Sequence, residues 1–356
     1  MTKKTRYFIV AAGTVLVVGL GGGLIAYLAY NRIAGVPGGV PAEVRYVPVD
    51  AEVVAFANVR AIMGSEVRRA LMPSIDPESR KGKQMMNDFA GVDLEKQVDH
   101  IVMYVEPFIT RDTNPEPAAP KPNGDGGSDF PRASMLVSGS FDQARIEQFI
   151  SERGGTIEEH NGRKIFVHQK GREQVAVGFV ENDLIAIGQA DLVRRAIDVS
   201  RGSAREFRNI TANADLMDLI RDASGSTAWV AGQFEEIRRR MRLPDSVSGK
   251  VPPVRFVSAK ADVNGGVKAT IRADTGDRAA ADQLRDVVRG FISLVRMQAG
   301  GKEDFANVLK TIELSGTDNT VRLSFAVSPE TLRAIAPQPR RGGPEHPDAV
   351  TPPPAK

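Results

Sequence analysis

The chain has 356 residues, and its 47 Lys and Arg against 44 Asp and Glu give a formal net charge of only +3. A charge so close to balance argues against nucleic acid as the main partner, because nucleic-acid-binding domains carry a concentrated basic surface. The sequence contains no cysteine, which excludes disulfides, thiolate metal sites and cysteine nucleophiles.

The first predicted element is a membrane-spanning helix over residues 7–30. Residues 8–30 contain no charged side chain, and a helix of this length extends about 35 Å, enough to cross a hydrocarbon core of about 30 Å. Three basic residues precede the span, whereas only Arg32 follows it closely. The positive-inside rule therefore predicts a cytoplasmic N-terminus over residues 1–6, a single pass through a bacterial inner membrane, and a periplasmic or extracellular remainder.

A cleaved signal peptide is the alternative for this segment. Its apolar core would have about 7 to 15 residues and end at a small-x-small cleavage site. Here the core is longer, and Tyr27, Leu28 and Tyr30 disrupt the nearest site, so we favour an uncleaved anchor. Within the span, Gly19 and Gly23 have the four-residue spacing that allows two membrane helices to pack closely. A glycine-rich span without a partner explains the same spacing.

The rest of the chain is predicted to contain two α+β lobes. Residues 31–43 form a linker rich in Gly and Pro, and the lobes are expected over 44–205 and 206–336. The first lobe is interrupted at about 107–132 by a segment rich in Pro, Gly, Asn and Asp, where we expect no packed structure. The Pro-rich tail over 337–356 is expected to be disordered.

From residue 44 onward, short apolar runs alternate with amphipathic segments, which predicts strands and helices in turn. Strands are predicted at residues 53–57, 101–105, 135–137, 156–160, 163–168, 175–180, 184–187, 228–231, 257–263, 267–273, 309–314 and 321–327. Helices are predicted at 62–71, 143–153, 192–199, 278–297 and 328–335. Asn161-Gly162 joins two of the strands, and this dipeptide is typical of a tight hairpin because both residues tolerate positive φ.

Tight turns between successive strands indicate antiparallel sheet, and the helices that follow the hairpins are expected to cover one face of it. The longest predicted helix supports this arrangement, since apolar residues recur along it at helical spacing. The predicted fold class is therefore α+β, with an N-terminal transmembrane helix and antiparallel sheet built from hairpins. A hairpin followed by a helix recurs along the chain, so two similar lobes are one interpretation, and duplication is left open.

Familiar catalytic and cofactor motifs are absent: the sequence has no P-loop, no Gly-x-Ser-x-Gly and no His-Glu-x-x-His. His160 and His168 fall on opposite faces of one predicted hairpin and cannot share a metal within it. We interpret His100, which precedes a strand, as a capped or solvated histidine. The sequence therefore predicts no catalytic residue, no metal and no cofactor, and we expect the chain not to be an enzyme.

One short segment is unusually basic. It contains four arginines, Arg238, Arg239, Arg240 and Arg242. Such a cluster could contact anionic lipid head groups close to the anchor. A solvated helix face is the alternative and the interpretation we favour, because two glutamates lie just before the cluster.

The start of the predicted exported domain carries a resemblance. Residues 46–59 read Tyr-Val-Pro-Val-Asp-Ala-Glu-Val-Val-Ala-Phe-Ala-Asn-Val, and residues 91–94, Gly-Val-Asp-Leu, precede Val-Asp-His-Ile-Val at 98–102. These segments resemble uncharacterised bacterial membrane-anchored families, whose exported domain begins with a Val/Leu-Pro-x-Asp element that leads into a strand and a helix. The resemblance implies architecture and location only, because these families have no assigned activity.

The leading hypothesis from the sequence is a single-pass, membrane-anchored protein whose extracytoplasmic domain binds a protein or envelope partner, as an accessory subunit of a membrane assembly. This hypothesis rests on the predicted membrane-spanning segment 7–30 and on the absence of catalytic motifs. Two alternatives stay open: an extracytoplasmic enzyme or small-ligand carrier with a cleft between two lobes, and a structural envelope protein.

Overall fold

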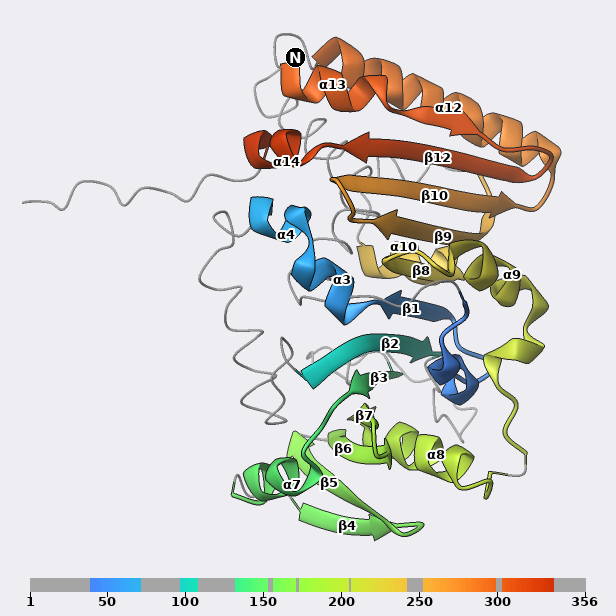
Figure 1. Cartoon of the computed structure of the whole chain (residues 1–356). Coiled ribbons are helices and arrows are strands. Elements are labelled where there is room, and N and C mark those ends of the chain that lie inside the picture. Colours follow the sequence, from blue (N-terminus) through green and yellow to red (C-terminus); the bar gives the residue numbers. More distant parts are fainter. Residues whose placement is uncertain are drawn as a thin grey trace, which may run out of the picture.

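The computed structural model shows one antiparallel sheet (Figure 1). Residues 39–71, 97–107, 132–152, 156–170, 173–204, 206–241, 252–298 and 303–335 are described by it. The predicted membrane span, most of the interrupting loop and the Pro-rich tail lie outside these ranges. Within the described ranges, no helix is long and apolar enough to cross a membrane.

The sheet has 12 strands in the order β11-β12-β10-β9-β8-β1-β2-β3-β7-β6-β5-β4. The strands are β1 (Val53–Ala57), β2 (Val98–Glu106), β3 (Arg132–Gly139), β4 (Thr156–His160), β5 (Arg163–Lys170), β6 (Glu173–Glu181), β7 (Leu184–Gln189), β8 (Ala228–Gln233), β9 (Val254–Asp262), β10 (Val267–Thr275), β11 (Glu313–Ser315) and β12 (Thr320–Val327). The helices are η1 (Ala42–Tyr46), α3 (Val59–Gly64), α4 (Glu66–Leu71), α7 (Gln143–Ser151), α8 (Ala190–Ser200), η3 (Ile210–Ala212), α9 (Ala214–Ala223), α10 (Phe234–Met241), α12 (Arg278–Gln298), α13 (Glu303–Lys310) and α14 (Pro329–Ile335), where η marks a 3-10 helix.

The strands β1 and β8 pair with each other in the interior of the sheet. Every residue of β1 is buried, as expected for an uninterrupted apolar strand. β1 pairs antiparallel with β2 on one side and with β8 on the other. We call β1 to β7 the first half of the sheet and β8 to β12 the second half. Outward from this pair, each half has its first three strands in chain order and its remaining strands in reverse order: β1-β2-β3-β7-β6-β5-β4 and β8-β9-β10-β12-β11.

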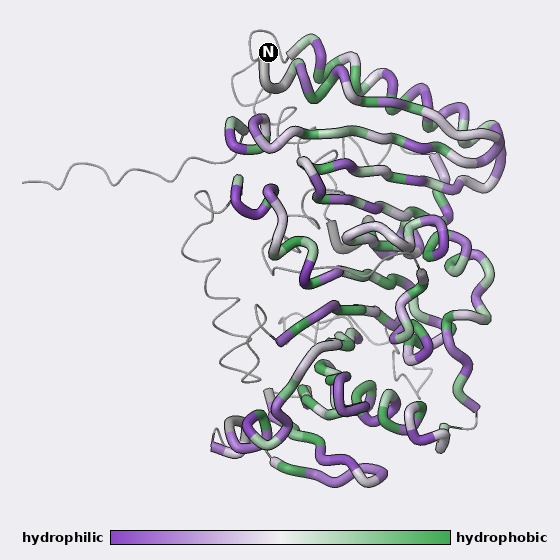
Figure 2. Tube along the Cα trace, viewed as in Figure 1, coloured by the Kyte–Doolittle hydropathy of each residue, from purple (hydrophilic) through white to green (hydrophobic). Residues whose placement is uncertain are grey.

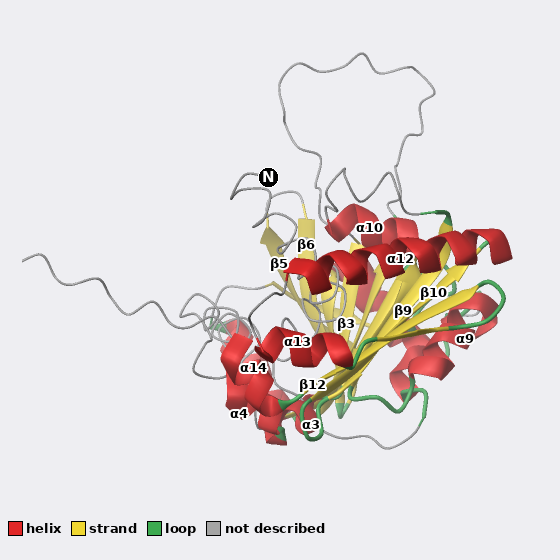
Figure 3. Cartoon of the chain, turned by 90° about the horizontal axis from the view of Figure 1, so that it is seen from above, coloured by secondary structure: helices red, strands yellow, loops and turns green. Residues whose placement is uncertain are grey.

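Helices cover the two faces of the sheet unequally. We define face A as the face that carries Val137 and Phe325, where α3, α4, α7, α13 and α14 contribute to one core cluster. Face B carries Tyr104 and Trp229, where η1, α8 and α9 contribute to the other large cluster. The long helix α12 packs over β10 and β12, with Ala281 beside Val321 on face A. Figure 3 shows α12 and α9 on opposite sides of the strands.

Face B of the second half is only partly covered. There α9 packs mainly on β8 and β9, and no described helix packs broadly over face B of β10, β12 and β11. Along β10, buried Val267 and Ala269 alternate with exposed Lys268 and half-buried Thr270. This period of two is typical of a sheet with one apolar face and one solvated face, and Figure 2 shows the mixture of hydrophilic and hydrophobic positions along these strands.

Two of the predicted elements differ from the structure. The helix predicted over 62–71 is two short helices, α3 and α4, because Ser65 between them is extended, with φ −73° and ψ 153°. The strand predicted over 309–314 is wrong for its first residues, since 303–310 form α13 and only Glu313–Ser315 are a strand. Leu309 is buried at 7% exposure, so tertiary packing of an apolar helix side overrides the local strand pattern.

Gly139, at the end of β3, tests the packing of the first half. A Cβ at this position would lie 1.9 Å from the carbonyl oxygen of Gln97, so Gly139→Ala forces the backbone apart. We expect the free energy of unfolding, measured by urea denaturation, to fall by about 1–3 kcal/mol. Gly64→Ala is the control, because nothing lies within 4 Å of its added Cβ, and it should change stability by no more than about 1 kcal/mol. Equal losses for the two variants would contradict the close approach of β3 to residue 97.

Candidate functional site

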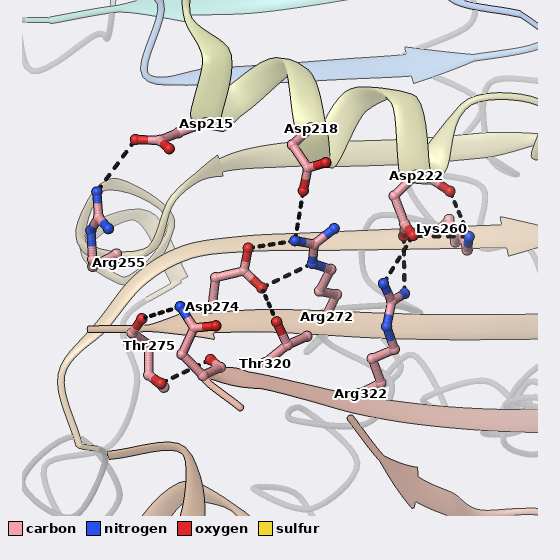
Figure 4. Close-up of polar contacts among 11 residues, drawn as sticks. Asp215, Asp218, Asp222, Arg255, Lys260, Arg272, Asp274, Thr275, Thr320 and Arg322 are labelled. Carbon is pink, nitrogen blue, oxygen red and sulfur yellow. Dashed lines mark hydrogen bonds and ion pairs between the residues drawn. The ribbon is translucent and has the colours of Figure 1, made fainter. Parts of the chain in front are cut away.

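A polar network on face B joins α9 to three strands (Figure 4). Asp215, Asp218 and Asp222 of α9 form ion pairs with cations of β9, β10 and β12, and we call these three residues the aspartate ladder. The cations are Arg255 and Lys260 of β9, Arg272 of β10 and Arg322 of β12.

The sequence of α9 explains why the aspartate ladder faces the strands β9, β10 and β12. Its aspartates are spaced at i, i+3 and i+7 and therefore lie on one side of the helix. Leu216, Leu219 and Ile220 are buried on the side that packs against β8 and β9. The helix begins after Asn213, whose side-chain oxygen accepts a hydrogen bond from the backbone N–H of Leu216 at 3.1 Å, an N-cap of the usual kind.

Arg272 lies at the middle of the network. Its guanidinium donates two hydrogen bonds to Asp274, at 2.9 and 2.8 Å, and one to Asp218 at 2.7 Å. Burial lowers the pKa of Arg272, but the hydrogen bonds and charges of Asp274 and Asp218 outweigh burial and raise it. Arg272 is directly opposite Arg322 on the neighbouring strand. Two like charges directly opposite each other on neighbouring strands destabilise a sheet unless anions compensate them. The carboxylates bound to Arg272 and Arg322 supply that negative charge.

Asp222 is the most deeply placed member of the ladder, with 24% of its side chain exposed. It accepts hydrogen bonds from Arg322 at 3.1 and 2.9 Å, and Lys260 lies 3.5 Å away. Burial raises its pKa, but the hydrogen bonds from Arg322 and the nearby cations outweigh burial and lower it. An aspartate near the C-terminal end of a helix is disfavoured by the helix dipole, so the tertiary ion pairs must account for its position.

A second polar cluster is buried on face B of the first half. Glu43 of η1 accepts a hydrogen bond from Ser138 of β3 at 2.5 Å, and the same oxygen lies 2.8 Å from His100 Nε2 of β2. The His100 ring also contacts Phe56, with centroids 5.8 Å apart. The interpretation of His100 as capped or solvated is therefore wrong: its side chain is only 16% exposed, because folding brings η1 over the start of β2.

The electrostatics of Glu43 favour its ionised form. Burial raises the pKa of Glu43, but the hydrogen bonds from His100 and Ser138 and the charge of His100 outweigh burial and lower the pKa below its ordinary value of 4.5. In this cluster the carboxylate lies between the hydroxyl and the imidazole, so the histidine is not placed to take a proton from Ser138, as a serine nucleophile requires. The cluster fastens η1 to the sheet.

The arginines at the other end of β2 are paired within the chain. Glu106 is 2% exposed and accepts hydrogen bonds from Arg132 and Arg195. Burial raises the pKa of Glu106, in spite of the two arginines. On α8, Arg194 pairs with Glu158 at 2.5 Å. These ion pairs connect α8 to the sheet, and none of the three arginines presents an unpaired charge to an anionic surface.

The side chains of the residues predicted as site residues all lie outside what the structure describes. Gly19, Gly23 and Arg242 lie outside the described residues. The backbone of 238–240 belongs to α10, while the orientation of these three arginine side chains is not described. Among the described residues, no group of three or more His, Asp or Glu could hold a metal ion. The aspartate ladder had a local signal, the i, i+3, i+7 spacing, but the pairing of β10 with β12, which brings Arg272 opposite Arg322, had none.

No protein-family model and no curated protein sequence matches the chain. Crystal form III of TP0453 is similar in structure with a TM-score of 0.47 and 8% sequence identity, over 85% of this chain and 98% of that chain. Crystal form I of TP0453 gives 0.46 and 8%, over 84% and 97%. Similarity at this level assigns neither family nor function.

Removing the charge of Asp222 should destabilise the protein. Asp222→Asn leaves the two opposed arginines with one fewer anion, so we expect the free energy of unfolding to fall by about 1–3 kcal/mol. Asp215→Asn is the matched control on the same helix: its side chain is 61% exposed and its contact with Arg255 is longer, at 3.3 Å. The control should cost less than about 0.5 kcal/mol in urea denaturation. A loss at Asp215 as large as at Asp222 would contradict the assigned geometry.

The stabilisation from Glu43 should depend on pH in a defined direction. Because its pKa is lowered in the folded state, the stabilisation is fully present above the unfolded value of about 4.5 and is lost as pH falls through the folded pKa. Glu43→Gln should lower the free energy of unfolding by about 1–3 kcal/mol at pH 7. The difference between wild type and variant, measured by urea denaturation from pH 7 to pH 3, should shrink below pH 4.5. A difference that grows as the pH falls below 4.5 would have the wrong sign for this account.

Proposed function

We propose that the protein is a single-pass, membrane-anchored, extracytoplasmic binding protein that serves as an accessory subunit of a membrane or envelope assembly. Its docking surface is face B of β10, β12 and β11. The single observation that supports this role is the contrast between the two halves of one sheet. Among the described residues, this face is apolar and covered in the first half, but at β10, β12 and β11 it is polar and largely uncovered.

The contrast is visible at the level of strands. In the first half, Tyr104 and Leu136 are buried on face B beneath an apolar layer from η1 and α8. In the second half, Thr270 and Ser324 face each other with their hydroxyl oxygens 3.1 Å apart, and both remain half-buried. Polar side chains at these positions suit a surface that exchanges water for a hydrophilic partner, because direct and water-mediated hydrogen bonds make up much of such interfaces.

The anchor and the location of the domain are supported by the sequence. The charge-free stretch 8–30 is long enough to cross a bilayer, and the basic residues before it favour an N-terminus that stays in the cytoplasm. The lipid bilayer is then one partner, contacted through residues 7–30, and a protein is the other. The proposed alternatives, an enzyme or small-ligand carrier with an inter-lobe cleft and a structural envelope protein, stay predictions without a supporting contact among the described residues.

Site-specific photo-crosslinking tests the docking surface. A photoreactive amino acid is placed at Ser324 on face B or, as a control, at exposed Lys310 on α13 at face A, in the full chain within its native membranes. We expect a crosslinked product from position 324 and none from position 310, because only face B is proposed to meet the partner. Equal products from both positions, or none from either, would contradict the proposed surface. The chain should also remain in the membrane pellet after an alkaline carbonate wash, and recovery in the soluble fraction would contradict the anchor.

A further inference from the structure

Residues 42–51, which connect the predicted anchor and linker to β1, lie across face B, and we call them the strap. We propose that the strap and α9 form one coupled unit, so that a partner engaging face B of β10 and β12 through the residues of the aspartate ladder changes how tightly the strap is held. This inference rests on the proposed function and names a regulation of the same surface. Asn213 is the joint between the two elements.

The strap is fastened to the first half at two points. At its start, Glu43 is held by Ser138 and His100. Further along, the Tyr46 hydroxyl donates to Glu181 at 2.5 Å, and Arg45 donates to the same carboxylate at 2.7 Å. Burial and the hydrogen bond to Glu181 raise the pKa of Tyr46 to about 12, which keeps it a neutral donor. Val44 and Val47 are 1% and 0% exposed, so the strap is also packed in the core.

The second part of the strap is bonded to the chain segment that leads into α9. The backbone N–H of Val49 donates to the carbonyl of Arg208 at 2.9 Å, and that of Ile210 donates to the carbonyl of Val47 at 2.8 Å. Pro48 and Asn209 form a bridge between these hydrogen bonds. The strap therefore runs as a short antiparallel ribbon beside the connection between the two halves.

Asn213 uses its side chain for both elements at once. Its Oδ1 accepts from the N–H of Leu216 and caps α9, while its Nδ2 donates to the carbonyl of Val49 in the strap at 3.2 Å. A movement of the strap that breaks the second bond disturbs the first, because the same amide group makes both. A shift of α9 moves the amide in the same way, so the effect is reciprocal, as thermodynamic coupling requires.

The other end of α9 carries the contact with the docking surface. Asp222 is held by Arg322, a residue of β12 that lies on face B two positions from Ser324. A partner that takes Arg322 or Asp222 as its own contact removes this attachment of α9 to the strands. The helix then keeps its apolar packing on β8 and β9 but has fewer restraints on its position. Asn213 transmits this change in the position of α9 to Val49 and so to the strap. Because the strap follows the predicted anchor and linker, the way the anchor is attached to the domain changes as well.

Amide hydrogen exchange on the full chain in mild detergent tests the coupling without any partner. Glu43→Gln loosens the strap at its start, and Asp222→Asn loosens α9 at its end. In the wild-type background we expect Glu43→Gln to speed exchange in residues 214–223, and Asp222→Asn to speed exchange in residues 42–51, each by about three- to tenfold. Peptides from α12 serve as the internal control and should not change.

Asn213→Asp separates coupling from stability. Aspartate is as good an N-cap as asparagine, so α9 remains capped, but the carboxylate cannot donate to the carbonyl of Val49. In this background the cross-responses should become clearly smaller, because only the backbone hydrogen bonds of Val47 and Val49 with residues 208–210 still join the strap to the segment before α9. The inference is overturned if Glu43→Gln leaves α9 unchanged in the wild-type background, or if the cross-responses persist undiminished in Asn213→Asp. Either failure would leave the docking surface itself untouched, because photo-crosslinking at Ser324 tests that surface independently.

Discussion

The antiparallel pairing of β1 with β8 is the contact on which the rest of the structure depends. It joins two stretches of chain that lie far apart in the sequence into one sheet of 12 strands. β1 is buried along its whole length and pairs with β2 on one side and β8 on the other. It is therefore an interior strand of one continuous sheet. Each face of the joined sheet then has to be covered by other elements or made compatible with water.

The chain meets this requirement in two ways. In the first half, apolar side chains on both faces are buried by helices and by the strap. In the second half, face A is apolar beneath α12, α13 and α14, whereas face B carries an ion network with the cations Arg255, Lys260, Arg272 and Arg322. Individual exposed ion pairs contribute little to stability. The network fixes the position of α9 relative to the strands. Asn213, which caps α9, is in turn hydrogen-bonded to the strap.

Local signals were sufficient to predict much of the fold. The hairpin at Asn161-Gly162 is confirmed, with φ values of 50° and 73°, because the turn geometry is encoded in two adjacent residues. The α+β class is confirmed, with helices packed on a large antiparallel sheet. The helix predicted over 328–335 is also confirmed: it is α14, and Ser328 Oγ just before it accepts a hydrogen bond from the backbone N–H of Thr331.

What could not be predicted depends on contacts between distant segments. The pairing of β1 with β8 leaves no local trace, because an apolar strand is compatible with many neighbours. Glu43, His100 and Ser138 come from three elements and meet only after folding, so His100 looked solvated in sequence. Helix α9 is absent from the predicted elements although its apolar residues recur at helical spacing. Its aspartates became a recognisable network only when the strand register placed Arg272 opposite Arg322.

The central claim is that, among the described residues, face B of β10 and β12 is open to solvent while face A is covered. Because the chain has no cysteine, single cysteines can be introduced along β12 and labelled with a membrane-impermeant maleimide in intact, membrane-bound protein. The account predicts fast labelling at positions 324 and 326 and slow labelling at the buried positions 325 and 327. Uniformly slow labelling, or fast labelling at 325 and 327 instead, would contradict it.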